Sequence, residues 1–258
     1  MWRIRIDTST PKLALEVRDS DLLLAHFCTL DLAEFRLNKL AVNPSKAWWQ
    51  GLEDAQHNLV FLHGYGDRKT GQHKGVTALA AEGGEVQWQL DEMAFYGLAS
   101  DGMLVYRADA PDQPLTLVNP KTGNTLRDGI SQQTAASLVA DFSQTRYTNW
   151  EYPVMYKDGE PYFEEVCNFI ADQSGEKPVV ALEYAELSNN IVISYYEEGA
   201  VGNLDNFVVV YDLQGNLHLK VKLGSGLSGI GSDTFFIFNL QLYLLRDKHI
   251  LQVYRLLA

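Results

Sequence analysis

Cysteine is scarce in this chain, because 258 residues contain only two, Cys28 and Cys167. The two lie far apart and each sits among apolar neighbours, so their spacing matches neither a CxxC redox pair nor a zinc knuckle. A free cysteine in such surroundings usually behaves as a small core residue. We therefore expect two reduced, buried thiols and no disulfide bond.

Positive charge is scarce as well. The chain has 21 Lys and Arg against 33 Asp and Glu, a formal net charge of -12. Nucleic acid binding needs a cationic face that releases counterions, and an anionic membrane surface needs the same kind of face. We therefore expect no nucleic acid and no membrane as partners, which leaves an unknown protein or a small anionic ligand.

Long hydrophobic runs are also missing. The most apolar early stretch, "LLLAHFCTL" from Leu22 to Leu30, is far too short to span a bilayer. The beginning "MWRIRIDTSTPK" is interrupted by the charged residues Arg3, Arg5 and Asp7, so it is not a signal peptide. Together with the unpaired cysteines, these features predict a cytoplasmic protein.

Strand signals dominate what is present. The 13 Tyr, 11 Phe and 5 Trp, with frequent Val, Leu and Ile, favour strands. Short apolar runs bounded by turn residues predict individual strands. These runs are "LALEV", "LVFLHG", "VTALA", "FYGLAS", "MLVYR", "LTLVN", "VVALEYA", "IVISYY", "FVVVYDL", "FFIF" and "LYLLR". Hairpin turns are predicted at Asp101-Gly102, Asp158-Gly159 and Asp247-Lys248.

Three segments share one strand-turn-strand pattern. They are "VTALAAEGGEVQW" from Val76, "LTLVNPKTGNTL" from Leu115 and "VVVYDLQGNLHL" from Val208. In each, a strand ends at Ala, Asn or Asp, and a glycine then supplies the positive φ that closes a hairpin. These glycines are Gly84, Gly123 and Gly215. Their spacing fits multiples of about 40–45 residues, the length of a propeller blade of four strands.

Two segments have helical spacing instead. "SQQTAASLVADF" places Ala135, Leu138, Val139 and Phe142 on one face, with Ser131 as a cap. "PYFEEVCNFIADQSG" places Phe163, Val166, Cys167 and Ile170 on one face, with Gly175 as a stop. We expect both faces to pack against sheets.

The segment "VTALAAEGGEVQW" resembles the strand-turn-strand of quinoprotein-type propeller blades. "WWQGL" from Trp48, "FLHGY", "HKG", "ISYY" and "GIGSDTFF" resemble an uncharacterised bacterial family catalogued as a domain of unknown function. The blade resemblance implies an all-β, β-propeller-like fold. We expect one domain over residues 1–258, with five four-stranded blades and a small helical insertion around residues 131–175.

Closure of the expected ring is assigned to the N-terminal strand. The C-terminal segment from Phe235 offers three strands where a blade needs four, and the segment Trp2 to Asp7 has no earlier hairpin partner. Pairing the two would remove unpaired sheet edges.

The stretch "FLHGYGDRKTGQHKG", Phe61 to Gly75, is the densest collection of functional residue types. A phosphate-binding P-loop would need Lys and Ser or Thr where Gln72-His73 stand. His63, Asp67 and His73 could ligate a metal, but no short spacing holds them together, so no metal is predicted. Two interpretations remain: an exposed hairpin loop from Tyr65 to Lys74, or a loop that binds an anion.

The candidate binding residues are His63, Arg68, Lys69, His73 and Lys74. No catalytic residue and no cofactor is predicted, because no complete catalytic motif is present. The predicted function is therefore a non-catalytic binding or scaffold protein. The alternative is a carbohydrate hydrolase on a five-bladed ring, which would place two carboxylates across a funnel. Its candidates are Glu183, Glu197, Asp205 and Asp212.

Overall fold

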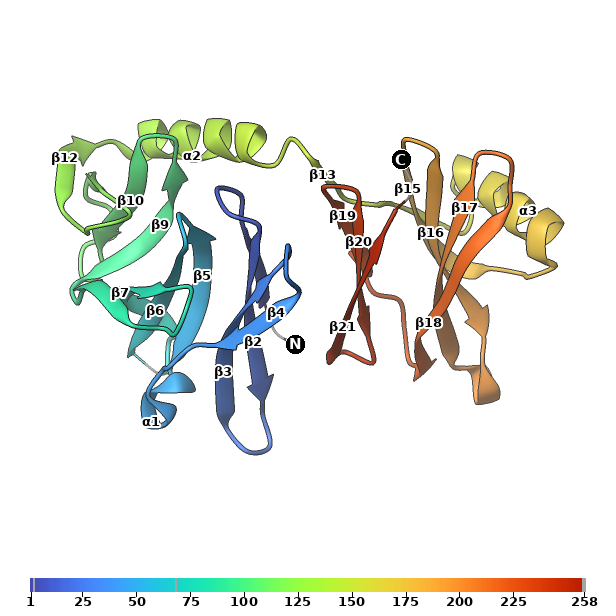
Figure 1. Ribbon diagram of the computed structural model, residues 1–258, viewed down its shortest axis with the longest axis horizontal. Helices are drawn as coiled ribbons and strands as arrows, with labels where there is room; N and C mark the ends of the chain where they lie inside the picture. The colour runs from blue at the N-terminus through green and yellow to red at the C-terminus, as the bar shows by residue number, and fades with distance from the viewer. Residues whose placement is uncertain (2, 68, 257–258) are drawn as a thin grey trace. The chain divides into compact units, whose positions relative to one another are not determined.

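A computed structural model describes residues 1, 3–67 and 69–256 of the chain (Figure 1). These residues form two compact units, Met1–Thr148 and Asn149–Ala258, which are described separately. Both units consist mainly of antiparallel sheets, so the predicted predominance of β-structure is confirmed. The single domain and the five-bladed ring stay predictions. No helix in the described ranges is long and apolar enough to cross a membrane.

The first unit contains three four-stranded sheets, each formed by strands that follow one another along the chain. The first sheet has β1 (Arg3–Asp7), β2 (Lys12–Asp19), β3 (Leu24–Asp31) and β4 (Arg36–Lys39). The second has β5 (Gln50–Gln56), β6 (Leu59–Asp67), β7 (Gln72–Ala80) and β8 (Val86–Leu90). The third has β9 (Met93–Ala99), β10 (Gly102–Arg107), β11 (Leu115–Val118) and β12 (Thr125–Ile130). A short helix, α1 (Pro44–Ala47), precedes the second sheet.

The apolar faces of these sheets pack against one another. Phe27 of the first sheet shares a buried cluster with Leu52 and Leu62 of the second. Phe61 on the second sheet shares another with Met103 on the third. Because the second sheet is covered on both faces, "LVFL" in β6 is apolar without alternation.

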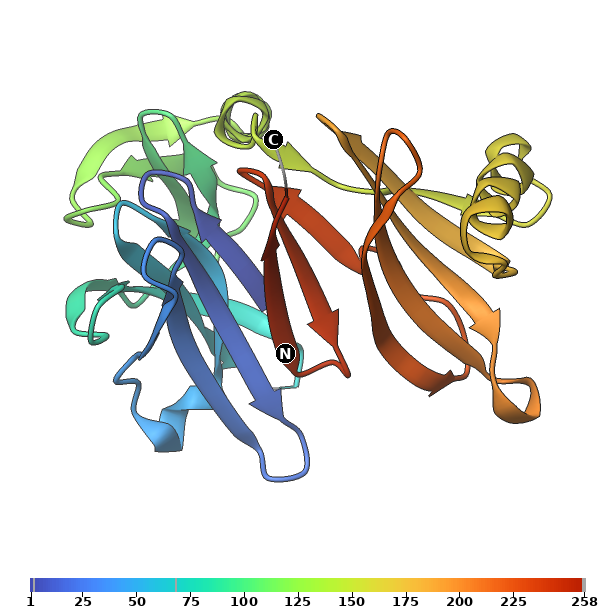
Figure 2. The same ribbon diagram turned by 45° about the vertical axis from the view of Figure 1, so that its right-hand side comes forward.

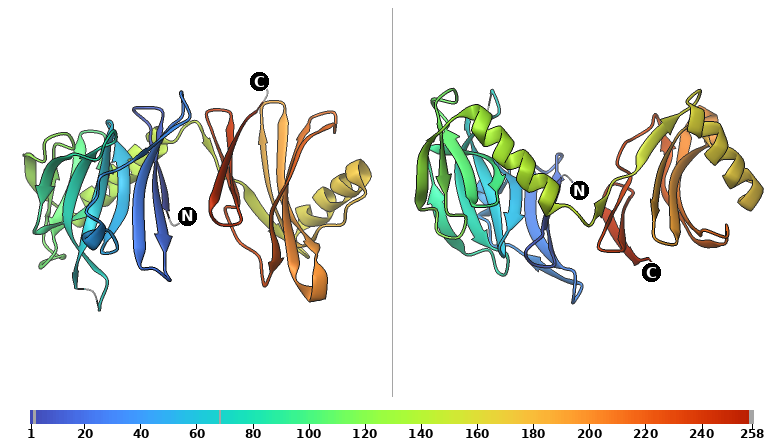
Figure 3. Two further views of the ribbon diagram at one scale, coloured as in Figure 1. Left: turned by 60° about the horizontal axis from the view of Figure 1, so that its bottom comes forward. Right: turned by 90° about the horizontal axis from the view of Figure 1, so that it is seen from above.

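Helix α2 (Gln132–Arg146) packs on the third sheet (Figure 3). The predicted cap is confirmed, since Ser131 accepts a hydrogen bond from the Thr134 N–H. At the other end, the Arg146 side chain donates to both carboxylate oxygens of Asp54 at 2.8 and 2.9 Å and to the Ile6 carbonyl at 2.7 Å. This buried guanidinium ties the end of α2 to the first and second sheets.

The second unit contains two sheets. A five-stranded sheet has β14 (Val154–Lys157), β15 (Val179–Leu187), β16 (Asn190–Glu198), β17 (Leu204–Asp212) and β18 (Leu217–Leu227). A four-stranded sheet has β13 (Trp150–Glu151), β19 (Phe235–Phe238), β20 (Gln241–Arg246) and β21 (Ile250–Arg255). Helix α3 (Pro161–Ser174) lies on the five-stranded sheet through Phe163 and Ile170, and it ends at Gly175 as predicted (Figure 2). A 3-10 turn, η1 (Ala200–Gly202), links β16 to β17.

The repeated turn found in the sequence recurs in three of the sheets. Gly84, Gly123 and Gly215 all have positive φ, between 72° and 83°. Their N–H groups donate to the carbonyls of Ala80, Asn119 and Asp212 at 2.8–3.1 Å. Each turn joins the last two strands of its meander, so the prediction of a shared structural unit is confirmed.

The predicted role of the N-terminal strand is wrong. The described part of the segment, Arg3–Asp7, pairs with β2, and the C-terminal sheet takes β13 as its fourth strand; Trp2 lies outside the described residues. The cause is the turn after β1, where the Asp7 carboxylate accepts from the N–H groups of Ser9 and Thr10 at 2.9 and 3.1 Å. This Asx turn closes a hairpin that the sequence analysis did not recognise.

Two smaller expectations also change. Asp158-Gly159 does not close a hairpin, because the chain continues into α3 and β14 pairs with β15 instead. The hairpins after β9 and β20 are confirmed.

Cys28 and Cys167 are free, as predicted, but both are partly exposed. Burial raises the pKa of the Cys167 thiol to about 11, so this thiol is not activated.

The β1–β2 turn gives a direct test of the corrected topology. Asp7 is buried and also accepts from the Asn58 N–H at 2.7 Å, so Asp7→Ala removes several charge-assisted hydrogen bonds at once. We expect it to lower the free energy of unfolding by about 2–4 kcal/mol in urea titrations. The control is Asp19→Ala, an exposed aspartate that makes the same kind of turn contact with Asp21 and should cost under about 1 kcal/mol. Equal midpoints for the two variants would contradict the structural role of Asp7.

Candidate functional site

The two histidines of the Phe61 to Gly75 stretch meet in the first unit. His63 on β6 and His73 on β7 have ring centroids 3.5 Å apart and an interplanar angle of 14°. The hairpin expected between them is present, with β6 extending to Asp67 and β7 beginning at Gln72. The connection is therefore shorter than the predicted loop from Tyr65 to Lys74.

Strand register explains why the rings stack. Tyr65 is the direct cross-strand partner of His73, and His63 lies two residues earlier on the same strand. Side chains two apart on a strand share a face, so all three project from one side of the hairpin. Tyr65 packs edge-on against both imidazoles, with centroids 5.0 and 5.6 Å away.

A glutamate completes the cluster. The Glu53 Oε1 atom lies 2.8 Å from Nδ1 of His63 and 2.8 Å from Nδ1 of His73. Glu53 is the extra residue of a bulge in β5, because Leu52 pairs with Leu62 and Asp54 with Phe61. Bulges re-aim side chains, and this one turns the carboxylate toward the two imidazoles.

The cluster is largely withdrawn from solvent. The side chains of His63, Glu53 and His73 are 2%, 12% and 35% exposed. Burial alone would raise the pKa of Glu53, but the close histidine contacts outweigh it and lower this pKa to about 2. Although Nδ1 of His63 is close to Glu53, neither ring nitrogen of His63 has an aligned hydrogen bond among the described residues. Buried nitrogens without an aligned hydrogen bond are rare, and a bound ion is one explanation for them.

Gly51 is the residue that makes room for His63. The two are cross-strand partners, and a Cβ built on Gly51 would lie 2.4 Å from Cε1 of the imidazole. Any larger residue would push the ring out of its place. The glycine in "WWQGL" is therefore explained by the packing of the cluster.

Two of the predicted cationic residues, Lys69 and Lys74, contact carboxylates rather than the histidines. Lys74 forms an ion pair with Glu92 at 2.7 Å. Lys69 is exposed, and its N–H donates to the Asp67 carboxylate at 2.8 Å in the hairpin turn. Arg68 lies outside the described residues. The anion-binding role of this loop stays a prediction.

Glu53 was missed by the sequence analysis. Its only visible signal is spacing, because Glu53, His63 and His73 follow one another at intervals of ten residues. In a meander, residues at such intervals on consecutive strands can align across the sheet. The bulge that turns Glu53 toward the histidines has no clear sequence signature.

A polar cavity of about 300 Å³ adjoins the cluster within the first unit. Glu53 and His73 form part of its wall, and the other polar residues include Arg5, Tyr96, Ser143 and Tyr147. The Arg5 guanidinium donates to the Glu53 carbonyl at 2.8 Å. The cluster is therefore accessible to a small molecule on the side of His73.

The four candidate carboxylates of the hydrolase alternative do not form one group, because each makes contacts of its own. Glu183 accepts from the N–H groups of Asp233 and Thr234, and Asp212 accepts from residues of its own turn. Glu197 and Asp205 are cross-strand partners, but Asp205 forms an ion pair with Lys222 at 2.7 Å. This arrangement resembles stabilised turns and surface pairs rather than an acid and a base across a funnel.

Comparison with known proteins agrees with the predicted resemblance to a family of unknown function. Residues 6–88 match the family model described as Domain of unknown function (DUF4905), and this range includes Glu53, His63 and His73. A search of the curated proteins finds no match.

Three solved structures that match this chain are distant likenesses. The β-propeller domain of the Trilobed protease from Pyrococcus furiosus is 10% identical with a TM-score of 0.33, covering 97% of this chain and 79% of that one. A structure from a study of two prolyl endopeptidases is 11% identical with a TM-score of 0.32, covering 97% and 41%. KlHsv2 with loop 6CD replaced by a Gly-Ser linker is 8% identical with a TM-score of 0.30, covering 98% and 76%. Likenesses this weak assign no function.

The role of Gly51 can be tested by substitution. Gly51→Ala should displace the His63 ring and lower the free energy of unfolding by about 1–3 kcal/mol, because the added methyl group overpacks a buried site. Gly229→Ala is the control, since a Cβ there meets nothing within 4 Å. Urea unfolding midpoints measure the stability of both variants. An unchanged midpoint for Gly51→Ala would show that the His63 ring can shift without loss of stability.

Proposed function

We propose that this chain is a binding protein that holds a divalent transition-metal ion between Glu53, His63 and His73. The observation that carries the proposal is the convergence of one carboxylate oxygen and two imidazole nitrogens from three neighbouring strands. Ligand atoms of the three residues all lie within 4.8 Å of one another. No metal is predicted from the sequence, because the candidate ligands have no short spacing; the β5–β6–β7 meander brings Glu53, His63 and His73 together instead.

The donor set favours a particular class of metal. Imidazole nitrogens suit zinc, copper, iron and nickel, whereas calcium and magnesium prefer sites built from oxygen atoms. Two histidines and one carboxylate are the protein ligands of some catalytic zinc sites and of non-haem iron sites. We therefore take Zn²⁺ as the reference ion, because it needs no redox partner.

Binding an ion would require the three side chains to separate and the two imidazoles to tilt. With metal–ligand bonds of about 2.1 Å, the ligand atoms around a tetrahedral zinc stand roughly 3.4 Å apart. The two Oε1–Nδ1 separations are 2.8 Å. Each Oε1–Nδ1 separation would lengthen by about 0.6 Å, the difference between 3.4 and 2.8 Å. The two rings, which are stacked with an interplanar angle of 14°, would also tilt apart so that both Nδ1 lone pairs point at one ion.

Local electrostatics support the same assignment. A carboxylate that keeps its charge at a low pH, as the lowered pKa of Glu53 indicates, can neutralise part of the charge of a cation. Arg3 lies beside the other oxygen, Oε2, at 3.8 Å. Arg3 therefore pairs with Oε2, while Oε1 faces the two histidines. Three protein ligands leave a coordination position for water or a small ligand from the adjoining cavity.

Metal titration tests the proposal. Protein stripped with a chelator should bind one equivalent of Zn²⁺ in isothermal titration calorimetry, and Glu53→Gln or His73→Asn should weaken binding more than about tenfold. His218→Ala is the matched control, because His218 lies 3.0 Å from Asp212 in an exposed pair of the second unit. Binding that is absent in the wild type, or equal in all four proteins, would leave the cluster as a structural hydrogen-bonded network.

The same site makes a stability prediction. An ion that binds only the folded chain adds about 2.7 kcal/mol at a hundredfold excess over its Kd. For a chain of this size that corresponds to a rise in Tm of roughly 5–10 °C. Differential scanning calorimetry with and without Zn²⁺ measures the rise. It should disappear in Glu53→Gln and return to the baseline when a chelator is added to the wild type.

A further inference from the structure

The second unit carries a cavity of about 370 Å³ between helix α3 and the five-stranded sheet, which we call the aromatic cavity. Its size falls within the range of roughly 300–1,000 Å³ that small-molecule sites occupy. Its lining contains four aromatic side chains, Tyr156, Tyr162, Phe169 and Tyr184. Glu165 is the one charged residue among the described residues that line it.

Strand register places two of the rings together. β14 pairs with β15 so that Val154 lies opposite Tyr184, and Tyr156 lies two residues beyond Val154 on the same strand. Residues two apart on a strand share a face of the sheet, and so do direct cross-strand partners. Tyr156 and Tyr184 therefore share a face, and both pack against the buried cluster that Phe163 and Ile170 of α3 form with this sheet.

Helix α3 supplies the other side of the cavity. Tyr162, Glu165 and Phe169 lie on one side of the helix, because they follow one another at intervals of three and four residues. The Phe169 ring packs edge-on against Tyr211 of the sheet, with centroids 5.1 Å apart. The Tyr162 ring is 5.5 Å from that of Tyr156 and tilted by 53°. Tilted rings do not cover each other's faces, so they can form two walls around a ligand.

The charge around the aromatic cavity is negative. The Tyr184 hydroxyl donates to the Glu186 carboxylate at 2.8 Å. Burial, this hydrogen bond and nearby negative charges, including that of Glu165, raise the pKa of Tyr184, so its ring stays neutral. Glu165 makes no hydrogen bond or ion pair with a described residue, and no described Lys, Arg or His lines the cavity. Its carboxylate is therefore available to a cation from solution.

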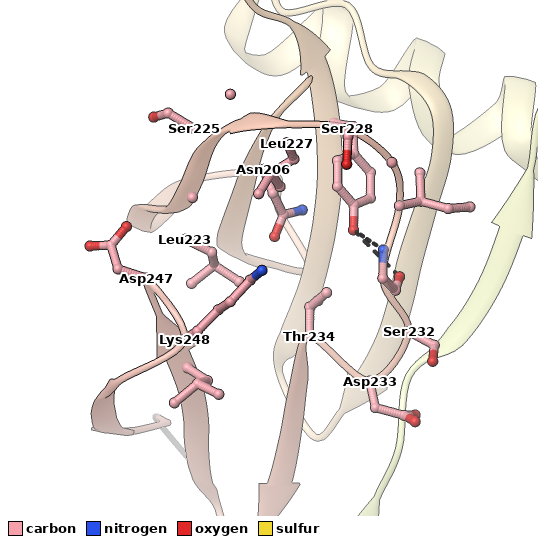
Figure 4. Close-up of a pocket in the computed structure, with 17 residues that line it drawn as sticks. Asn206, Leu223, Ser225, Leu227, Ser228, Ser232, Asp233, Thr234, Asp247 and Lys248 are labelled. Carbon is pink, nitrogen blue, oxygen red and sulfur yellow. Dashed lines mark hydrogen bonds between the residues drawn. The ribbon is translucent and has the colours of Figure 1, made fainter. Parts of the chain in front are cut away.

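Another cavity of the same unit has a different character. It has a volume of about 730 Å³, and much of its wall is the glycine- and serine-rich segment 224–234 (Figure 4). Tyr196 is the one aromatic residue of its described lining, and its hydroxyl accepts a hydrogen bond from the Gly231 N–H at 2.8 Å. A concentration of rings is thus a particular property of the aromatic cavity beside α3.

The chemistry of this lining favours a cation without N–H groups. Aromatic ring faces attract cations, and a nearby carboxylate adds Coulomb attraction. A primary ammonium group carries three N–H donors, which would lose their hydrogen bonds to water against aromatic surface. A quaternary ammonium group has no donor to satisfy and presents methyl groups to the rings, which is why aromatic cages recognise such groups.

We propose that the aromatic cavity binds a small molecule with a quaternary ammonium head group, a cation of the choline type. The head group would lie among the rings of Tyr156, Tyr162 and Tyr184, beside the Glu165 carboxylate. The site lies within the second unit and shares no residue with the proposed metal centre of the first.

The test is an NMR titration of the full chain at low ionic strength with choline and with its neutral isostere 3,3-dimethyl-1-butanol. A chelator is present so that metal binding in the first unit cannot contribute. Choline should bind at least about fivefold more tightly, because the two molecules share a shape and differ in charge. The shifted amide signals should belong to α3, β14 and β15. Equal affinities, or no binding of choline at roughly 10 mM, would overturn the inference.

Two variants with matched controls locate the site. Tyr162→Leu should weaken choline binding by roughly three- to tenfold, because it removes one ring. Tyr162 is 58% exposed, so the fold should tolerate the change, and its control is Tyr152→Leu, which changes a tyrosine that is 56% exposed and outside the described lining. Glu165→Gln should weaken binding by roughly two- to fivefold. Its control is Glu164→Gln, an exposed neighbour on α3 outside the lining. Either variant binding choline as its control does would contradict the proposal.

Discussion

Strand register is the constraint on which the candidate metal centre depends. A shift of one residue in an antiparallel pair turns every side chain to the opposite face. In the β5–β6–β7 meander the ladder is irregular at three places: at Glu53, near Gly75, whose φ is +85°, and at Gly66, between Tyr65 and Asp67. Without them, the ladders would continue evenly and Glu53 would have an ordinary partner on β6. The cluster therefore exists because the sheet is irregular where the three ligands meet.

Most of the fold could be predicted because its signals are local. Apolar runs such as "FVVVYDL" and glycine turns such as Gly123 act within a few residues, and the structure confirms both. The helix stop at Gly175 is of the same kind. The pairing of β1 was missed because Asp7 stabilises its turn through a side chain rather than through glycine. The role of β13 was missed because it brings together Trp150 and Phe238, which are far apart in the chain.

The candidate metal cluster and the segment "GIGSDTFF" differ in what the sequence could show. His63 and His73 were identified by composition, but their partner Glu53 became visible only when the bulge in β5 was known. The segment "GIGSDTFF" from Gly229 was noticed as a resemblance, yet its hydrogen bonds with Glu183 and Tyr196 join residues more than thirty positions apart. Residue type can therefore indicate that a segment is unusual. It cannot indicate which distant side chains will hold it.

The net charge of the chain does not by itself explain which cation the proposed metal centre would select. A net charge of -12 raises the concentration of all cations near the surface, including sodium and magnesium, so charge alone cannot select a transition metal. Imidazole nitrogens can, because magnesium and sodium bind them poorly.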